Sequence, residues 1–234
     1  MYQLYIANKN YSSWSLRPWV LLKERNIPFE EVLVPFDTAT SYARFKVFSP
    51  TGKVPCLLDG AQVVWDSLGI VEYLAERHSG IWPADPAARV WARCASAEIH
   101  SGFVALRQRC TMNCGIRVQL MEIPADLRRD LDRLDELWNE GLARFGGPFL
   151  AGEAFTAVDA FYAPVAFRAQ TYHLPLSTPA LEYAARLRAL PSMMAWYDGA
   201  LHEGWRDPEH EADASGCGKL LADLRVPPSS SGGG

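Results

Sequence analysis

Residues 2–22 read YQLYIANKNYSSWSLRPWVLL. Polar and apolar residues alternate from Gln3 to Ala7, a pattern that predicts a β-strand. From Ser15 to Arg25 the apolar residues recur at helical spacing, and Pro18 lies near the start of that segment, where helices tolerate proline. This part of the chain therefore predicts a strand and a helix that are joined by a polar loop.

Strand and helix patterns continue to about residue 78. Phe29 to Pro35 has the composition of a strand. Residues 56–65 predict a β-hairpin, because an Asp-Gly pair at 59–60 separates two apolar runs. A helix is predicted to follow from about residue 68. The order β-α-β and then β-β-α predicts a small α/β domain over residues 1–78.

The pattern changes after Pro86, and we expect no strand beyond that point. Apolar residues fall on one helical face from Leu127 to Trp138. The long helix that they predict begins near Pro124 and ends at the glycine pair 146–147.

Further helix starts follow along the second half. Thr156 and Asp159 are spaced nearly as in a helix capping box, so we assign Asp159 to folding. Pro179 and Pro191 each begin another helical stretch. Together these features predict an all-helical domain over residues 86–205.

The linker and the end of the chain have their own composition. His78 to Asp85 is the expected linker between the two domains. Residues 206–234 are a C-terminal extension, acidic at 207–217, in which Lys219 to Arg225 is predicted to form a short helix. The Pro/Ser/Gly-rich residues 227–234 predict a flexible tail.

Composition excludes several classes of protein. The chain has 234 residues, of which 49% are hydrophobic and 21% charged, and its net charge is −4. This composition is typical of a globular protein and lacks the basic excess of a nucleic-acid binder. No apolar run approaches the ~20 residues of a membrane span, and the first residues lack a secretory signal. Five scattered cysteines argue against a disulfide framework, so we expect a cytoplasmic protein without nucleic-acid or membrane partners.

A polar loop at residues 10–15, NYSSWS, precedes the first predicted helix. Its hydroxyls and the unpaired N–H groups of the helix start suit an anion such as a thiolate or a carboxylate. The alternative is that one serine only caps the helix.

Two further polar features come later in the first domain. In Gly52-Lys53-Val54-Pro55-Cys56 a proline opens a strand, where it is either an ordinary trans proline or a cis proline that leaves Val54 free to pair with an extended ligand. Asp66-Ser67 lies where a strand runs straight into a helix. The pair caps that helix, or it receives a carboxylate and an ammonium group.

In this order and spacing, the three features resemble the glutathione transferase family over nearly all of residues 1–205. Residues 12–17, SSWSLR, are similar to the Ser-Ser-Cys-Ser-x-Arg loop of the zeta class and of related bacterial transferases. The resemblance implies a thioredoxin-like N-terminal domain (α/β) followed by an all-α helical-bundle C-terminal domain, usually in a homodimer.

The resemblance also implies which loop hydroxyl is catalytic. Ser12 matches the serine that holds the glutathione thiolate, and Ser13 is its neighbour. Tyr5 and Tyr11 are rivals, because other classes of the family use a tyrosine near the first strand.

The residues expected to bind glutathione follow from the same resemblance. Lys53 and Val54 match positions that contact the cysteinyl backbone and a nearby carboxylate, and Pro55 matches the cis proline of the family. Asp66 and Ser67 match the pair that receives the γ-glutamyl end.

The implied function is that of a detoxifying transferase, with glutathione as co-substrate and an electrophilic small molecule as the second substrate. A glutathione-dependent isomerase of the maleylacetoacetate isomerase type is one alternative, and a non-catalytic docking module of the same fold is another. Trp14 stands where the zeta-class loop has cysteine, which disfavours that isomerase activity. No cysteine precedes Cys56, which disfavours thiol–disulfide exchange at this loop.

Other candidate residues carry weaker signals. Cys110 and Cys114 are interpreted as half-buried thiols, and we expect no metal site. Arg107, Arg109 and Arg117 either line a substrate pocket that faces the serine loop or solvate a helix face.

Overall fold

A four-stranded sheet forms the first part of the computed structural model, which describes residues 1–37 and 39–227. The strands lie in the order β2-β1-β3-β4. Strand β2 runs parallel to β1, whereas β3 pairs antiparallel with both β1 and β4. The strands are β1 Tyr2–Ile6, β2 Phe29–Leu33, β3 Cys56–Asp59 and β4 Gln62–Trp65. The predicted hairpin at residues 56–65 is therefore confirmed.

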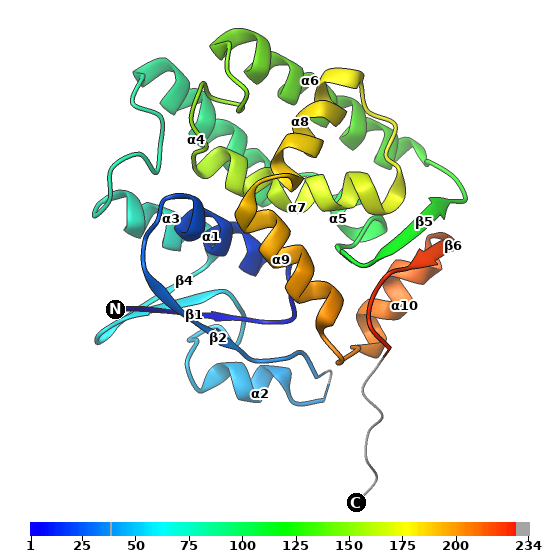
Figure 1. Cartoon of the computed structure of the whole chain (residues 1–234), viewed down its shortest axis with the longest axis horizontal. Coiled ribbons are helices and arrows are strands. Elements are labelled where there is room, and N and C mark those ends of the chain that lie inside the picture. Colours follow the sequence, from blue (N-terminus) through cyan, green and yellow to red (C-terminus); the bar gives the residue numbers. More distant parts are fainter. Residues whose placement is uncertain (38, 228–234) are drawn as a thin grey trace, which may run out of the picture.

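Three helices accompany this sheet. Figure 1 shows α1 (Ser13–Glu24) and α3 (Ser67–Ala75) on the side of the sheet that faces the rest of the molecule, with α2 (Ser41–Lys46) on the opposite side. Helix α1 buries eight consecutive residues from Ser15 to Leu22, because both the sheet and the second half of the chain pack against it. This is the predicted thioredoxin-like arrangement.

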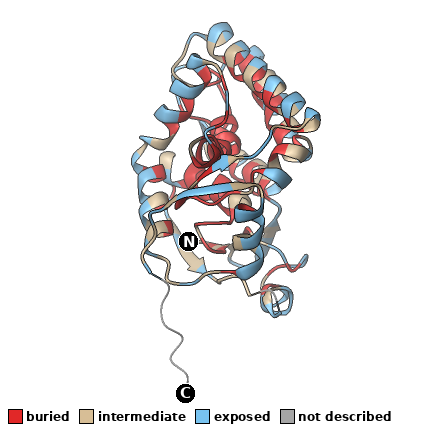
Figure 2. Cartoon of the chain, turned by 90° about the vertical axis from the view of Figure 1, so that its right-hand side faces the viewer, coloured by how far each residue is buried: buried red, intermediate tan, exposed pale blue. Residues whose placement is uncertain are grey.

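The second half of the chain is a bundle around one buried helix. Nearly every residue of α7 is buried, and α7 packs against α1, α4 and α8. Figure 2 shows the buried residues gathered in the interior of the molecule, with exposed residues around them. The capping box of Thr156 and Asp159 begins α7, and Gly146 ends α6 in the left-handed conformation, both as predicted. The helices are α4 Pro86–Ser101, α5 Val104–Arg109, α6 Ala125–Phe145, α7 Ala157–Tyr172, α8 Thr178–Arg188 and α9 Pro191–His202. Over the described residues, no helix combines the length and the apolar character that a membrane crossing requires.

The expectation of no strand after Pro86 is wrong. Strands β5 (Ile116–Leu120) and β6 (Gly218–Asp223) form a separate antiparallel ribbon, so the segment from Lys219, predicted as a short helix, is a strand. The acidic segment before it is helix α10 (Pro208–Gly216). Residues 116–120, IRVQL, do alternate in polarity, but β6 lies about a hundred residues from its partner, so no local pattern predicts their pairing.

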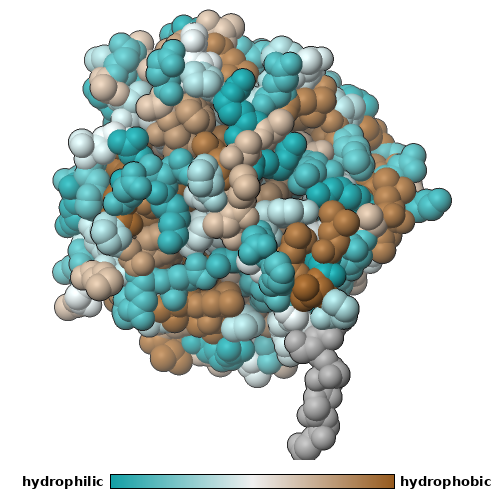
Figure 3. Space-filling model, in the orientation of Figure 1, coloured by the Kyte–Doolittle hydropathy of each residue, from teal (hydrophilic) through white to brown (hydrophobic). Residues whose placement is uncertain are grey.

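This ribbon leaves apolar side chains exposed. Leu220 and Leu221 on β6 are half-exposed, and Figure 3 shows hydrophobic surface on the side of the molecule where β5 and β6 lie. The tail expected at residues 227–234 falls almost entirely outside the described residues.

The two halves pack through α1, which contacts α7 and α9. The Trp196 ring on α9 meets the Trp19 ring on α1 edge-on, with centroids 5.1 Å apart, and the Trp196 indole N–H donates to the Lys9 carbonyl oxygen at 2.8 Å. A fully desolvated aromatic pair of this kind fixes how the second half lies over the first. The division at residues 1–78, 86–205 and 206–234 stays a prediction.

Candidate active site

A cavity of about 500 Å³ opens beside the start of α1. Ser12, Ser13, Lys53 and Val54 line it. Its volume lies within the range of about 300–1,000 Å³ that is typical of small-molecule sites. Four of the seven site residues that were predicted from the sequence thus line one cavity.

A second cavity of about 470 Å³ adjoins the first, because Trp14, Lys53 and Val54 line both. Pro55 and the Asp66-Ser67 pair line the second cavity as well. All seven predicted site residues therefore face one continuous depression, although they come from three separate segments of the chain.

The hydroxyl of Ser12 is not used as a helix cap. Ser12 occupies the N-cap position of α1, but its side chain accepts no bond from a backbone N–H of the helix, and its Oγ donates to Ser15 Oγ at 2.7 Å. Only 5% of Ser12 is exposed. Ser12 thus stands at the cap position, as the alternative had it, but its side chain does not cap the helix and lines the cavity instead.

A carboxylate from the helical half holds the loop that leads to Ser12. Glu203, just after α9, accepts from the backbone N–H groups of Lys9 at 2.6 Å and Asn10 at 3.3 Å. Burial raises the pKa of Glu203, and the two backbone N–H groups oppose that rise. The position of the loop thus depends on a residue about 190 positions away.

The phenol of Tyr11 already has an acceptor. Its O–H donates to Glu211 Oε1 on α10 at 2.6 Å, and burial followed by that carboxylate raises the pKa of Tyr11. The Tyr5 ring stacks on Phe48 at 4.1 Å between centroids. Tyr5 lines neither cavity, and Tyr11 lines the first with its proton held by a carboxylate. The Ser12 proton is held only by a neutral hydroxyl, Ser15 Oγ, and the Ser12 hydroxyl must turn from it to donate to a sulfur.

The loop before β3 and the start of α3 have unusual backbones. The Val54–Pro55 peptide bond is cis, as the resemblance implied. Asp66 has a φ of +64°, uncommon for a residue other than glycine, and its Oδ1 accepts from the Leu68 N–H at 2.8 Å. Strained residues of this kind concentrate at functional sites. Asp66 is exposed, with the His100 ring 3.5 Å from its Oδ1, while Ser67 is almost fully buried.

Of the three arginines proposed for a pocket, Arg107 lines the larger cavity. Arg109 instead pairs with exposed Asp126 at 2.9 Å, and Arg117 donates to the Cys114 and Ile116 carbonyl oxygens at 3.1 and 2.7 Å. Helix α5 points only one of its two arginines into the cavity.

Sequence reasoning missed Arg17 and Arg168, which also line the larger cavity and are at least 95% buried. A signal was present, because Arg168 interrupts an otherwise apolar run in α7. Charged residues are almost never fully buried unless they are paired or functional.

The cysteines lie away from this chemistry. All five are free, and Cys110 and Cys114 are fully buried. Burial raises the pKa of Cys110 to about 12 and that of Cys114 further still. Within the described part of the chain, no group of three or more metal-ligating side chains comes together.

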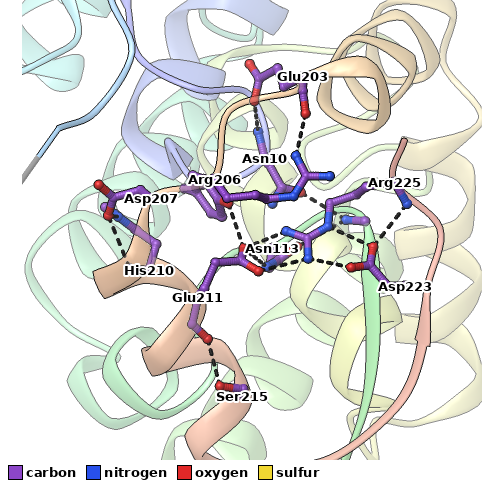
Figure 4. Close-up of polar contacts among 12 residues, drawn as sticks. Asn10, Asn113, Glu203, Arg206, Asp207, His210, Glu211, Ser215, Asp223 and Arg225 are labelled. Carbon is purple, nitrogen blue, oxygen red and sulfur yellow. Dashed lines mark hydrogen bonds and ion pairs between the residues drawn. The ribbon is translucent and has the colours of Figure 1, made fainter. Parts of the chain in front are cut away.

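The C-terminal extension forms the outer wall of the cavity. The His210 ring is stacked between the rings of Tyr11 and Phe36, with centroids 5.0 and 4.7 Å away. The carboxylate of Glu211 accepts from Arg225, which also pairs with Asp223 at 2.7 Å (Figure 4). This network ties α10 and the end of β6 to the loop that carries Ser12.

The fold and this depression define a two-domain protein in which a thioredoxin-like domain carries a cavity and a helical domain closes it. Models of the glutathione S-transferase N-terminal domain and C-terminal domain match residues 11–77 and 97–199. The chain therefore belongs to the glutathione transferase family.

Individual relatives support the same assignment. The chain is 31% identical over 167 residues to glutathione S-transferase DHAR2 of Arabidopsis thaliana, covering 70% of this chain and 67% of that protein. It is 27% identical over 182 residues to a probable maleylacetoacetate isomerase of Caenorhabditis elegans, covering 74% and 81%. A glutathione transferase homolog from Burkholderia GL BGR1, solved with bound glutathione, shares the fold with a TM-score of 0.64 at 22% identity, over 85% of this chain and 97% of the other.

Proposed function

We propose that this chain binds glutathione along the continuous depression and that Ser12 holds the glutathione thiolate there. By family the chain is a transferase enzyme, and glutathione is its co-substrate. The observation that carries the residue assignment is that Ser12, Val54 and Ser67, from three separate segments, face one depression. Structural neighbours solved with bound glutathione support the proposal that the chain binds glutathione.

The proposed chemistry begins with the thiol. A serine hydroxyl that donates a hydrogen bond to the thiolate favours the charged form and lowers the thiol pKa. Ser12 precedes α1, whose N-terminus adds positive potential. The sulfur then forms a bond to an electrophilic carbon, and the leaving group departs with its electron pair. The enzyme supplies the anion site and proximity, and glutathione supplies the nucleophile.

The second cavity is proposed to bind the other end of glutathione. The Asp66 carboxylate suits the γ-glutamyl ammonium group, and the Ser67 hydroxyl at the start of α3 suits the adjacent carboxylate. The exposed Lys53 ammonium suits a carboxylate, and Val54 offers its backbone to the cysteinyl residue.

Reduced glutathione is expected to bind once per chain with a Kd between micromolar and millimolar, or about −4 to −8 kcal/mol, in a calorimetric titration. Ser67→Ala should lose about 1.5–3 kcal/mol of that binding, because it removes a hydrogen bond to a charged group. Turnover at saturating glutathione should change far less. The control is Ser101→Ala, an exposed serine that donates to the Ala97 carbonyl oxygen at the end of α4. No heat with several millimolar glutathione would favour the non-catalytic docking module.

We also propose a homodimer in the cytoplasm. The dimer is proposed because members of the family are usually homodimers. The cytoplasm is proposed because all five cysteines are free thiols, as is typical of a reducing compartment. Light scattering at micromolar concentration should give a mass near twice the 26.1 kDa of one chain. A mass of one chain would reject the dimer.

Glutathione-dependent isomerisation is a second candidate, because relatives named probable maleylacetoacetate isomerase are similar to most of the chain. Both reactions begin with the same thiolate. Mass spectrometry separates them, since conjugation adds glutathione to the product, whereas isomerisation leaves the substrate mass unchanged.

A further inference from the structure

Three guanidinium groups line the larger cavity: those of Arg107 and Arg168 from the helical half, and that of Arg17 from α1. Arg168 donates its Nε–H to the Cys110 carbonyl oxygen at 2.8 Å, and Arg107 donates from Nη1 to the His100 carbonyl oxygen at 2.9 Å. Arg17 has a buried Nε without a hydrogen-bond partner. Among the described residues none of the three forms an ion pair with a carboxylate, so no contacting carboxylate neutralises their charge.

The charge balance of this cavity opposes that of the whole chain. Its lining holds these three arginines and Lys53 against one carboxylate, the exposed Asp213, whereas the net charge of the chain is −4. More distant carboxylates, Asp66 near Arg17 and Asp130 near Arg107, offset part of the charge. A cavity lined by one sign of charge concentrates ligands of the opposite sign.

Burial makes these charges costly in the absence of a ligand. Burial first, and then the neighbouring arginines, lowers the pKa of Arg17 to about 9. Burial likewise lowers the pKa of Arg168 to about 10. An unpaired buried cation is strongly destabilising, and a bound anion relieves that penalty.

Trp14 keeps two of the arginines at the cavity. The centroid of its ring lies 4.1 Å from Arg17 Cζ and 5.2 Å from Arg107 Cζ, within the range of cation–π attraction. The tryptophan that distinguishes this loop from the zeta-class loop thus packs against guanidinium groups, which a cysteine side chain could not do.

The anionic groups of glutathione have other partners in the proposed binding mode. Ser12 takes the thiolate, Lys53 a carboxylate and Ser67 the γ-glutamyl end, where Arg17 also reaches to 3.5 Å from Ser67 Oγ. Arg107 and Arg168 are the arginines of the cavity to which no group of glutathione is assigned. Resting on the proposed function, we propose that Arg107 and Arg168 bind a carboxylate of the second substrate, so that this enzyme selects anionic electrophiles. Arginine suits that task because its planar group donates two parallel hydrogen bonds to one carboxylate.

The reaction with a model electrophile balances simply. With 4-chloro-3-nitrobenzoate, the thiol proton goes to solvent and a sulfur lone pair forms a bond to the carbon that bears chlorine. The carbon–chlorine bond then breaks, and chloride leaves with its electron pair. The benzoate carboxylate takes no part in the bond changes, so it serves only as the group that the arginines recognise.

The test compares two probes that differ in charge. The protein is saturated with S-methylglutathione and titrated calorimetrically with 3-nitrobenzoate and with 3-nitrobenzamide, which is neutral and of similar shape. The benzoate should bind at least about tenfold more tightly, as expected for a hydrogen bond to a charged group. Arg107→Gln and Arg168→Gln should each remove most of this preference. Arg109→Gln, on the same helix α5 but paired with Asp126, should keep it. The conjugation rates of 4-chloro-3-nitrobenzoate and its amide, each divided by the uncatalysed rate, should show the same preference.

Equal affinity of the wild-type protein for both probes would overturn the inference, and this arm needs no variant to fold. So would a preference that survives in both Arg107→Gln and Arg168→Gln. If these variants instead weaken S-methylglutathione binding and leave the probe preference intact, the arginines belong to the glutathione site. Failure of the wild-type protein to bind S-methylglutathione would reject the proposed function, and titration of the unliganded protein with the two probes would still decide whether the arginines bind an anion.

Discussion

Ser12→Ala should raise the pKa of the bound glutathione thiol by roughly one to two units. A hydrogen bond to a charged group contributes about 1.5–3 kcal/mol, and each pKa unit corresponds to about 1.36 kcal/mol. Below the wild-type thiol pKa, turnover should then fall about tenfold to a hundredfold, because the thiolate fraction falls by that factor. The absorbance of the thiolate, measured against pH in the glutathione complex, reports the shift directly.

Two neighbouring hydroxyls provide matched controls. Tyr11→Phe should leave the thiol titration unchanged, because the Tyr11 proton is already donated to Glu211 at 2.6 Å. Ser13→Ala should also leave it unchanged if Ser13 is only a neighbour. A shift in either control without one in Ser12→Ala would transfer the catalytic role to that residue.

Asp159→Ala should lower the free energy of unfolding by at least about 3 kcal/mol, because it leaves several buried donors without an acceptor. Asp159 is fully buried, and its carboxylate accepts from the Leu150 N–H at 3.0 Å, the Thr156 N–H at 2.9 Å and the Tyr183 O–H at 2.9 Å. At about 2–4 °C per kcal/mol for a chain of this size, the melting temperature should fall by about 6–12 °C. The exposed Asp132→Ala on α6 is the control and should melt like the wild type.

The effect should also depend on pH. Burial raises the pKa of Asp159 from its ordinary value of 3.8 to about 6, against the opposing hydrogen bonds. Between these values the folded state binds more protons than the unfolded state, so the stability contributed by Asp159 falls as pH rises. Denaturant unfolding at several pH values should show the gap between wild type and Asp159→Ala narrowing from pH 4 to pH 6. A variant that melts normally but lacks activity would place Asp159 in the active site.

Only part of the role of Asp159 can be predicted from local sequence. The spacing of Thr156 and Asp159 by itself indicates a helix cap, since a cap depends on residues only three positions apart. The bonds from Leu150 and Tyr183 to the same carboxylate were not predictable, because they depend on how two other elements pack against α7. Those two added bonds are the reason that Asp159→Ala should lower the free energy of unfolding by more than the loss of an ordinary helix cap, about 0.5–2 kcal/mol.

In the candidate site, too, some residues carry a local sequence signal and others are placed only by tertiary packing. The loop around Ser12 and the Asp66-Ser67 helix start carry their own local signals, and the ordered set indicated the family. Arg168 stands out locally only as a charge within an apolar run. The packing of α7 against α1 is what brings its guanidinium to the cavity that Ser12 lines. The hydrogen bond from Tyr11 in that loop to Glu211 on α10 could not be predicted either, because the two residues are 200 positions apart in the sequence.

The sequence by itself thus determined the elements whose causes are local: the first strand and helix, the hairpin at 56–65, the long helix α6 and the capped start of α7. Periodicity, turn residues and caps act over a few positions, so they can be read along the chain. Only the tertiary structure decided that β6 is a strand, that the Tyr11 proton is committed to Glu211, and that Arg107 and Arg168 meet in one cavity. Those features depend on hydrogen bonds and burial between segments about 60 to 200 residues apart, which form only when the whole chain has folded.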